Sequence, residues 1–194
     1  KEAKATLEEG ITHFNKIDNK DLRSSIECYY DSRYIQLYTL LKKQDLVELY
    51  AQKLFKKAEI LSNSDPQKNS YLVIASRVLA DINIQQKRFE KANFYIKIQE
   101  NLVPTLKNAF DVGMYHKTKA KYLLESTDSE NLDIDLAILH LKRAEDNLIL
   151  TKDSIFIHDL YLELSQSYQL KQDDISEKYY LDRSRLFKTE FPVL

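Results

Sequence analysis

The sequence is almost without glycine and proline. Its 194 residues contain two glycines, Gly10 and Gly113, and three prolines, where average usage would give roughly 14 and 10. Sheets, sandwiches and barrels need tight turns, and tight turns depend on these two residue types. A glycine-rich phosphate loop is also excluded, because its motifs need at least two closely spaced glycines. The shortage therefore predicts an all-α fold.

Charge and cysteine content narrow the possible partners and the compartment. Lys and Arg number 29 against 30 Asp and Glu, so the basic excess typical of a nucleic-acid-binding domain is missing. Basic and acidic residues alternate, which favours solvated helix faces over a basic patch. No apolar run reaches the roughly 18 residues that span a bilayer, so we expect no membrane partner. The lone Cys28 and the lack of an Asn-x-Ser/Thr sequon indicate the reducing cytoplasm.

Apolar residues recur at helical spacing along nearly the whole chain. Polar clusters and prolines interrupt the pattern, as they do between helices. Asp45, Asp133, Ser154 and Asp174 stand where an N-cap would be expected. We expect a single helical domain over 1–194. Its nine helices should cover about 3–17, 22–43, 45–61, 67–86, 89–103, 106–125, 133–150, 154–170 and 174–187.

A small–large–small pattern recurs along the chain and distinguishes a stacked repeat from a simple bundle. Small residues let two helices approach closely, and the large residue fills the neighbouring groove. Helix pairs that return at such a period are typical of an α-solenoid. The pattern occurs at Ala51-Phe55-Ala58, Ala92-Ile96-Gln99 and Ala137-Leu141-Ala144, with a weaker copy at Glu177-Leu181-Ser184, at separations of 41, 45 and 40 residues.

One unit of the chain resembles a tetratricopeptide repeat. It has that motif's Leu–small pair, its aromatic turn residue, the first small and the bulky position of its second helix, and its terminal proline. It departs from the motif at Asn83, where tyrosine is usual, and at Gln99, the second small position. The resemblance implies a right-handed α-solenoid of four helix pairs preceded by an N-terminal helix. The matching residues are Leu79, Ala80, Phe89, Ala92, Ile96 and Pro104.

The degenerate repeats and their period also resemble the peptide-sensing regulators of Gram-positive bacteria, the Rgg, MutR, PlcR and Rap-like proteins. The stretches 110–115 and 119–125 are the most similar in style. The resemblance implies a quorum-sensing regulator whose solenoid binds a short signalling peptide and forms a homodimer, while an N-terminal helix-turn-helix domain reads DNA. The chain begins with Lys1 in a helical pattern, so we expect that DNA-binding domain to be missing from it. The alternative is a scaffold that binds a segment of a partner protein without switching.

In tetratricopeptide solenoids the first helix of each pair lines the concave face, so motif positions indicate candidate ligand-binding residues. Amides there can bond to the backbone of an extended peptide, and a lysine can pair with its C-terminal carboxylate. Arg77 and Asp81 could instead pair with each other. Lys117 and Lys121 could lie on a solvated face or bind an anionic group of the partner. The groove candidates are Tyr38, Arg77, Asp81, Gln85, Met114, Lys117, Lys121, Gln166 and Gln169.

Two unusual residues near these positions each have two interpretations. Asn83 is either a buried amide held by backbone groups or an inward amide that holds a peptide. Gly113 lies inside the sixth helix, where glycine costs about 1 kcal/mol relative to alanine. We expect it to face the groove beside Met114, where it marks either a close helix contact or room for a bound backbone.

No residue pattern indicates catalysis, and we expect a protein that is not an enzyme and has no cofactor. The histidines have no metal-ligand spacing, so no metal site is expected. Cys28 has no supporting nucleophile signature and is expected to be a structural thiol. Paired acids lie at helix starts or on exposed faces, where capping and solvation explain them. The four histidines are His13, His116, His140 and His158.

Overall fold

The computed structural model describes residues 2–14, 18–126, 133–151 and 154–190. These residues form nine α-helices and two short 3-10 helices, with no strand among them, which confirms the all-α prediction. No helix in the described ranges is long and apolar enough to cross a bilayer. The α-helices are α1 (Glu2–Phe14), α2 (Lys20–Leu40), α3 (Gln44–Ile60), α4 (Lys68–Gln85), α5 (Phe89–Leu102), α6 (Ala109–Glu125), α7 (Ile134–Leu148), α8 (Ser154–Leu170) and α9 (Asp174–Glu190), and the 3-10 helices are η1 (Val103–Thr105) and η2 (Ile149–Thr151).

Several predicted helix ends were wrong by about one turn. The helix expected over 22–43 ends at Leu40, because Lys42 adopts a left-handed φ of 54°. The helix expected from residue 106 begins only at Ala109, after Asn108 caps it by accepting the Phe110 N–H. The predicted ends at 103 and 150 fall in the 3-10 helices that follow α5 and α7.

The predicted N-caps were partly right. Asp133 caps α7, since its carboxylate accepts the Leu136 N–H at 3.0 Å. Asp45 and Asp174 lie inside the first turn of their helices rather than at the cap. At α9 it is the preceding Asp173 that accepts the Ser176 N–H, at 3.1 Å. The side chain of Ser154 lies outside the described residues.

Three helix pairs turn in the same way without using glycine. The second residue after the end of α2, α4 or α8 has a left-handed φ of 54°, 55° or 60°, at Lys42, Lys87 and Gln172 respectively. In each turn the next N–H reaches back five residues to a helix carbonyl, as a Schellman motif does. These bonds are Lys43 N–H to Tyr38, Arg88 N–H to Asn83 and Asp173 N–H to Tyr168. Lysine and glutamine therefore occupy the left-handed positions where glycine is usual, and they do so with backbone strain.

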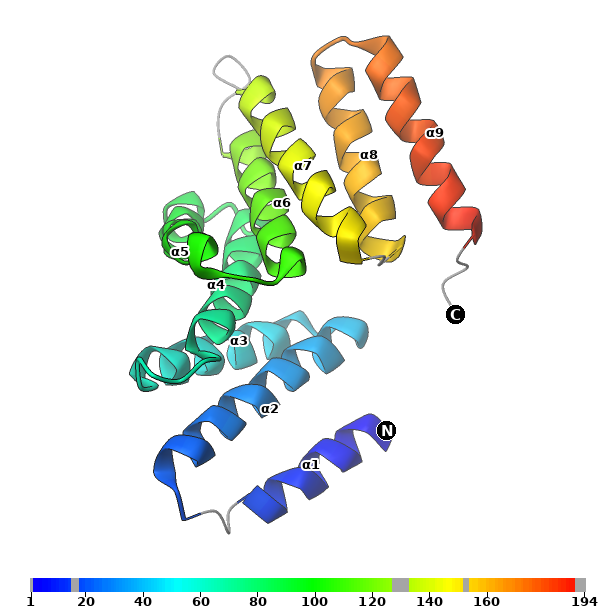
Figure 1. The fold of residues 1–194 in the computed structure, drawn as a ribbon. Coiled ribbons are helices and arrows are strands. Elements are labelled where there is room, and N and C mark those ends of the chain that lie inside the picture. The colour runs from blue at the N-terminus through cyan, green and yellow to red at the C-terminus, as the bar shows by residue number, and fades with distance from the viewer. Residues whose placement is uncertain (1, 15–17, 127–132, 152–153, 191–194) are drawn as a thin grey trace.

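The helices pack mainly against their neighbours in sequence, from α1 at the bottom of Figure 1 to α9 at the upper right. The most extensive contacts are within the pairs α2–α3, α4–α5, α6–α7 and α8–α9, and between α3 and α4. The first helices of successive pairs also meet directly, since α2 contacts α4 and α4 contacts α6. These contacts bring the inner faces of α2, α4 and α6 to one side.

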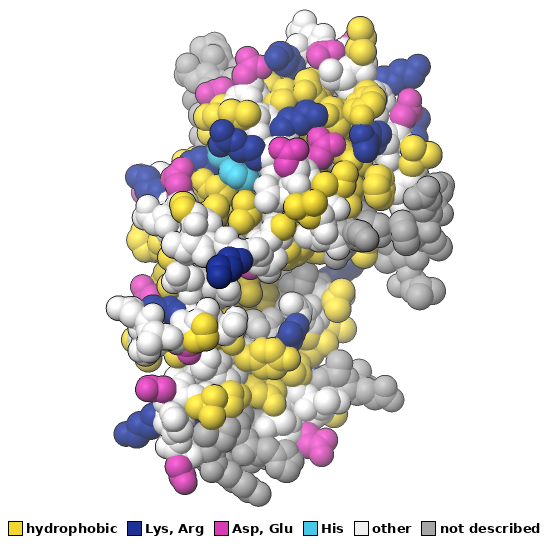
Figure 2. Space-filling model, in the orientation of Figure 1, with side chains coloured by type: hydrophobic (Ala, Val, Ile, Leu, Met, Phe, Trp, Pro, Cys, Tyr) yellow, Lys and Arg dark blue, Asp and Glu magenta, His cyan; other side chains and the backbone are white. Residues whose placement is uncertain are grey.

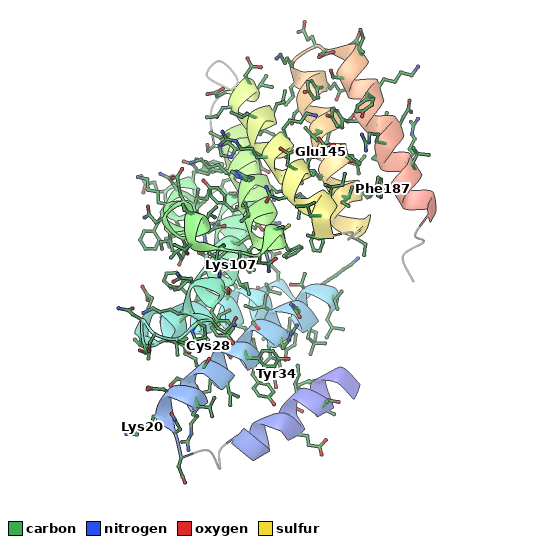
Figure 3. All side chains as sticks on the ribbon, viewed as in Figure 1. Lys20, Cys28, Tyr34, Lys107, Glu145 and Phe187 are labelled. Atoms are coloured by element: carbon green, nitrogen blue, oxygen red, sulfur yellow. The ribbon has the colours of Figure 1, made fainter. Side chains whose placement is uncertain are left out.

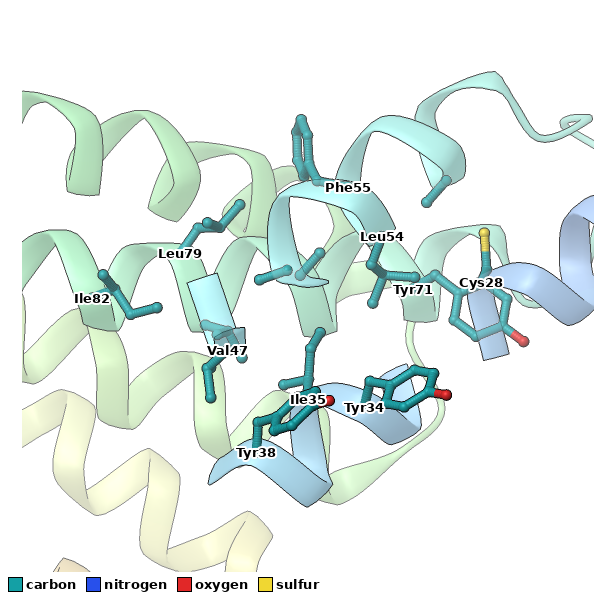
Figure 4. Packing of buried hydrophobic residues seen from close by; sticks show 14 of the residues in the cluster. Cys28, Tyr34, Ile35, Tyr38, Val47, Leu54, Phe55, Tyr71, Leu79 and Ile82 are labelled. Carbon is teal, nitrogen blue, oxygen red and sulfur yellow. The ribbon is translucent and has the colours of Figure 1, made fainter. Parts of the chain in front are cut away.

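Two large apolar clusters lie at opposite ends of the molecule (Figure 3), one around Cys28 and Tyr34 and one that Phe187 packs against. In the first, Leu54 and Phe55 of α3 meet the residues of α2 and α4 (Figure 4). A smaller cluster joins α4, α5 and α6 between them. The small–large–small positions on α3, α5 and α7 are all buried, whereas the weaker copy on α9 has only Ser184 buried.

Candidate peptide-binding groove

Three cavities follow one another across α2, α4, α6 and α8. They have volumes of about 350, 120 and 380 Å³. The first and second share Asp81 and Gln85, and the second and third share Lys121 and Glu163, so the three form one continuous groove. Eight of the nine predicted groove residues line it. They are Tyr38, Arg77, Asp81, Gln85, Met114, Lys117, Lys121 and Gln166.

The ninth candidate, Gln169, lines none of these cavities. It lies exposed in the last turn of α8, where its carbonyl accepts the N–H of Gln172 in the left-handed turn. The structure therefore places Gln169 beside the end of the groove rather than in it.

The first cavity is lined by apolar side chains and by more cations than anions. Val47 of α3 and Val78 and Ile82 of α4 provide apolar surface, together with Tyr38 of α2. The Tyr38 ring stacks on Tyr50, with centroids 5.5 Å apart. The charged residues of the lining are the cations Lys42, Lys43 and Arg77 and the carboxylate of Asp81.

Arg77 and Asp81 make only a marginal ion pair. Their closest nitrogen and oxygen are 3.9 Å apart, while Asp81 accepts a shorter hydrogen bond from Thr118 of α6, at 2.9 Å. Arg77 also acts on the buried Asp111, lowering a pKa that burial raises. Among the described residues, the buried Nε of Arg77 has no hydrogen-bond partner. The predicted pairing of Arg77 with Asp81 is thus only partly confirmed, and the Nε–H of Arg77 is left as a donor for other groups.

The middle cavity has the smallest volume of the three and forms a constriction of the groove, and a charged pair crosses it. Lys117 of α6 lies 3.2 Å from Glu163 of α8, and the two side chains are only 14% and 33% exposed. Burial raises the pKa of Glu163, although Lys117 and Lys121 both act to lower it. The solvated-face interpretation is therefore wrong for Lys117, because the protein itself supplies the anion. Sequence reasoning missed Glu163; the two lysines four residues apart were the available signal.

The third cavity is more apolar. Leu124 of α6, Leu141 of α7 and Leu170 of α8 line it, with Gln166 on the same helix as Leu170. Leu170 is 54% exposed, so this end of the groove offers an apolar surface to an incoming side chain.

Among the described residues, a polar contact between groove-lining side chains joins the helix pairs at each junction. Gln44 of α3 donates to Gln85 of α4 at 2.8 Å, and Thr118 of α6 donates to Asp81 of α4. The Lys117–Glu163 pair joins α6 to α8. All three contacts are made by groove-lining groups, so a ligand that competes for these groups acts directly on the spacing of the helices.

Asn83 and Gly113 lie away from the groove. Asn83 is buried and donates to the Leu79 carbonyl at 2.6 Å, which confirms the interpretation as a backbone-held amide. Gly113 faces α7 instead of the groove, so that expectation was wrong. A Cβ there would lie 2.6 Å from Cγ of Leu148, and Gly113 therefore marks a close helix contact.

A histidine pair that the sequence spacing did not reveal joins α6 to α7. The Nδ1 atoms of His116 and His140 are 3.0 Å apart. Burial, then His140 and Arg143, lowers the pKa of His116 to about 4. The pKa of His140 is also lowered by burial, Lys119 and Arg143. Both rings are neutral at pH 7, so they share one hydrogen bond. No group of three or more potential metal ligands occurs in the described part of the chain, and His13 has no described side chain.

No protein-family model matches this sequence, and a comparison with curated proteins finds none that is similar. The groove is thus defined by its own geometry: three adjoining cavities, with apolar side chains in both end cavities, three cations in the first and the Lys117–Glu163 pair at the middle constriction.

Proposed function

We propose that the chain is the regulatory peptide-binding and dimerisation domain of a quorum-sensing-type transcriptional regulator, with a right-handed tetratricopeptide-like solenoid as its scaffold. The observation that carries the proposal is the continuous groove across the inner faces of α2, α4, α6 and α8. Its elongated form suits an extended peptide, whose side chains would alternate between pockets while amides such as Gln85 and Gln166 bond to its backbone.

The groove offers groups suited to binding. Some of its charged groups are used in contacts between helices, at Asp81 and at Lys117–Glu163, and others line the cavities without an ion pair among the described residues. The free and buried thiol of Cys28 fits a reducing cytoplasm. DNA would be contacted only through a separate N-terminal helix-turn-helix domain, and a coding sequence upstream with about 60–70 residues of that pattern would support this part of the proposal.

Dimerisation is supported by the outer face of α9. Ile175 and Tyr179 are 86% and 50% exposed there. Acidic Asp174 and Glu177 lie near the start of α9 and Arg183 lies in its second half. A second copy packed antiparallel would bring opposite charges together around the apolar residues. Light scattering should show a dimer that Ile175→Lys converts to a monomer; a wild-type monomer at high concentration would contradict it.

The peptide-binding claim is tested by filling the groove. Gln85 is exposed and lines the first two cavities where they join. Gln85→Trp should reduce the affinity for a fluorescein-labelled random heptapeptide pool at least tenfold, measured by fluorescence anisotropy. Gln86→Trp is the matched control, because Gln86 is exposed next to it but lines none of the three cavities. Equal affinities of the two variants would contradict the groove as the binding site.

The second candidate function is a scaffold that binds a partner segment without switching. The extensive contact between α3 and α4 favours it, because residues of both helices line the first cavity. Small-angle scattering distinguishes the two: a regulator should change its radius of gyration when peptide binds, and a scaffold should not.

A further inference from the structure

We propose that the middle of the groove is a seat for a carboxylate of the bound peptide, and that Glu163 occupies this seat in the unliganded protein. The ligand is therefore an acidic peptide, bound through an Asp or Glu side chain or through its free C-terminus. This inference rests on the proposed peptide-binding function and adds the chemistry of the ligand and the way in which it acts on the fold.

The seat consists of two lysines on successive turns of α6. Lys117 and Lys121 both line the middle cavity, and both act electrostatically on the Glu163 carboxylate. Only Lys117 holds that carboxylate at ion-pair distance. Within the described ranges, Lys121 forms no ion pair. Two carboxylates share the middle cavity with the lysines: Glu163, which Lys117 holds, and Asp81, which accepts a hydrogen bond from Thr118. Two lysines four residues apart repel each other, and a carboxylate placed between them relieves that repulsion.

The charge balance of the whole groove points to the same ligand. Five cations line the three cavities against three carboxylates. Lys117 with Glu163 and Arg77 with Asp81 account for two of each. The remaining cations are Lys42, Lys43 and Lys121 and the remaining anion is Glu125, so the groove is left with a positive excess. An acidic occupant is attracted and a basic one is rejected.

Displacing Glu163 has a structural consequence. The Lys117–Glu163 pair crosses from α6 to α8 at the constriction. The Glu163 side chain is a third exposed, so it can turn towards water when a ligand carboxylate takes its place. The exchange removes the polar contact between α6 and α8, and the third cavity, which both helices line, is then free to widen. Binding of an acidic peptide would thus shift the arrangement of α8 and α9 relative to α6.

The test uses four fluorescein-labelled heptapeptide pools that contain either a central glutamate or a central glutamine, each with a free or an amidated C-terminus. The pools with a carboxylate should bind the wild-type chain about fivefold to tenfold more tightly than the amidated glutamine pool. The amidated glutamate pool and the free-acid glutamine pool each have only one of the two carboxylates, so they show whether the side chain or the C-terminus supplies the bound carboxylate. Glu163→Gln, which removes the internal competitor, should raise the affinity for the acidic pools about fivefold.

Lys121→Gln is a second variant, and it leaves the Lys117–Glu163 ion pair in place. It should lower the affinity for the acidic pools about tenfold. Lys97→Gln is the matched control, since Lys97 is exposed on α5 outside the groove; it should change nothing. If all four pools bind with equal affinity, or if Glu163→Gln lowers the affinity for the acidic pools, the proposed carboxylate seat is wrong and the proposed peptide-binding function stands. If no pool binds the wild-type chain, the proposed function and the seat both fail.

Discussion

The α4–α5 and α6–α7 pairs hold their two helices together in different ways. α4 and α5 are joined by a tight connection, with Lys87 in the left-handed conformation and the Arg88 N–H bonded back to Asn83. α6 and α7 are held by side chains instead: Gly113 lets Leu148 approach, and His116 bonds to His140. The turn determines how α4 and α5 are placed relative to each other, whereas contacts between side chains determine the placement of α6 and α7. Helix α6 of the second pair supplies Lys117 to the charged constriction of the groove.

The largest effects should come from removing a core side chain in each pair. Ile96 of α5 and Leu148 of α7 are both fully buried. Replacing either by alanine should lower the free energy of unfolding by about 2–5 kcal/mol. Leu148→Ala should lie at the upper end, because Gly113 has no side chain that could fill the cavity. Urea unfolding measures both, and a loss below about 1 kcal/mol for Leu148→Ala would contradict an interface set by that contact.

Gly113→Ala should destabilise the protein although alanine is the better helix former. The added Cβ would meet Cγ of Leu148 at 2.6 Å, and such overpacking costs about 1–3 kcal/mol. In the double variant Gly113→Ala/Leu148→Ala the two losses should not add, since the smaller side chain makes room for the new Cβ. Additive losses in thermal unfolding would show that the two residues do not set the helix spacing.

The histidine pair should make the α6–α7 interface sensitive to acid. The pKa of His116 is lowered from 6.5 to about 4 in the folded chain. Between these values the unfolded chain binds a proton that the folded chain does not, so the free energy of unfolding falls as the pH falls through this window. The charged groups around the pair are Glu100 of α5, Lys119 and Arg143.

The variant His116→Asn should reduce this acid sensitivity between pH 6.5 and 4. The comparison is made by urea unfolding of the wild type and the variant at several pH values in the same buffer. Parallel stability curves for the two proteins would mean that the pair does not titrate with folding.

The smallest effect should come from relaxing the turn of the α4–α5 pair. Lys87 has a φ of 55°, a conformation that glycine adopts without strain. Lys87→Gly should therefore raise the free energy of unfolding by about 0.5 kcal/mol, after the greater freedom of glycine in the unfolded chain is taken into account. A loss of stability in Lys87→Gly would mean that contacts of the lysine side chain, and not the conformation of the turn, hold α4 and α5 together.

Much of the fold could be predicted because it follows from local patterns. The apolar periodicity located all nine helices found in the described ranges, and the small–large–small positions on α3, α5 and α7 are buried. Some helix ends were less accurate: the helix expected to end at 43 ends at Leu40, because the left-handed turn at Lys42 uses a residue that gives no turn signal. A glycine at this position would have revealed the turn.

The candidate site was predictable only in part, for a physical reason. Motif register places eight of nine chosen residues along one groove. Register does not show which charges are already paired within the fold, and Glu163 comes to Lys117 from a helix more than 40 residues away. The contact between His116 and His140 is hidden in the same way, because only the packing of α6 on α7 brings them together.

Binding of an extended peptide along the inner faces of four helices is best tested by hydrogen–deuterium exchange with and without a saturating heptapeptide pool. We expect slower exchange in the groove segments of α2, α4, α6 and α8, with the largest change near the Lys117–Glu163 constriction, and little change on the outer faces of α5 and α9. Protection confined to α5, α7 or α9, with none on α4 and α6, would contradict it.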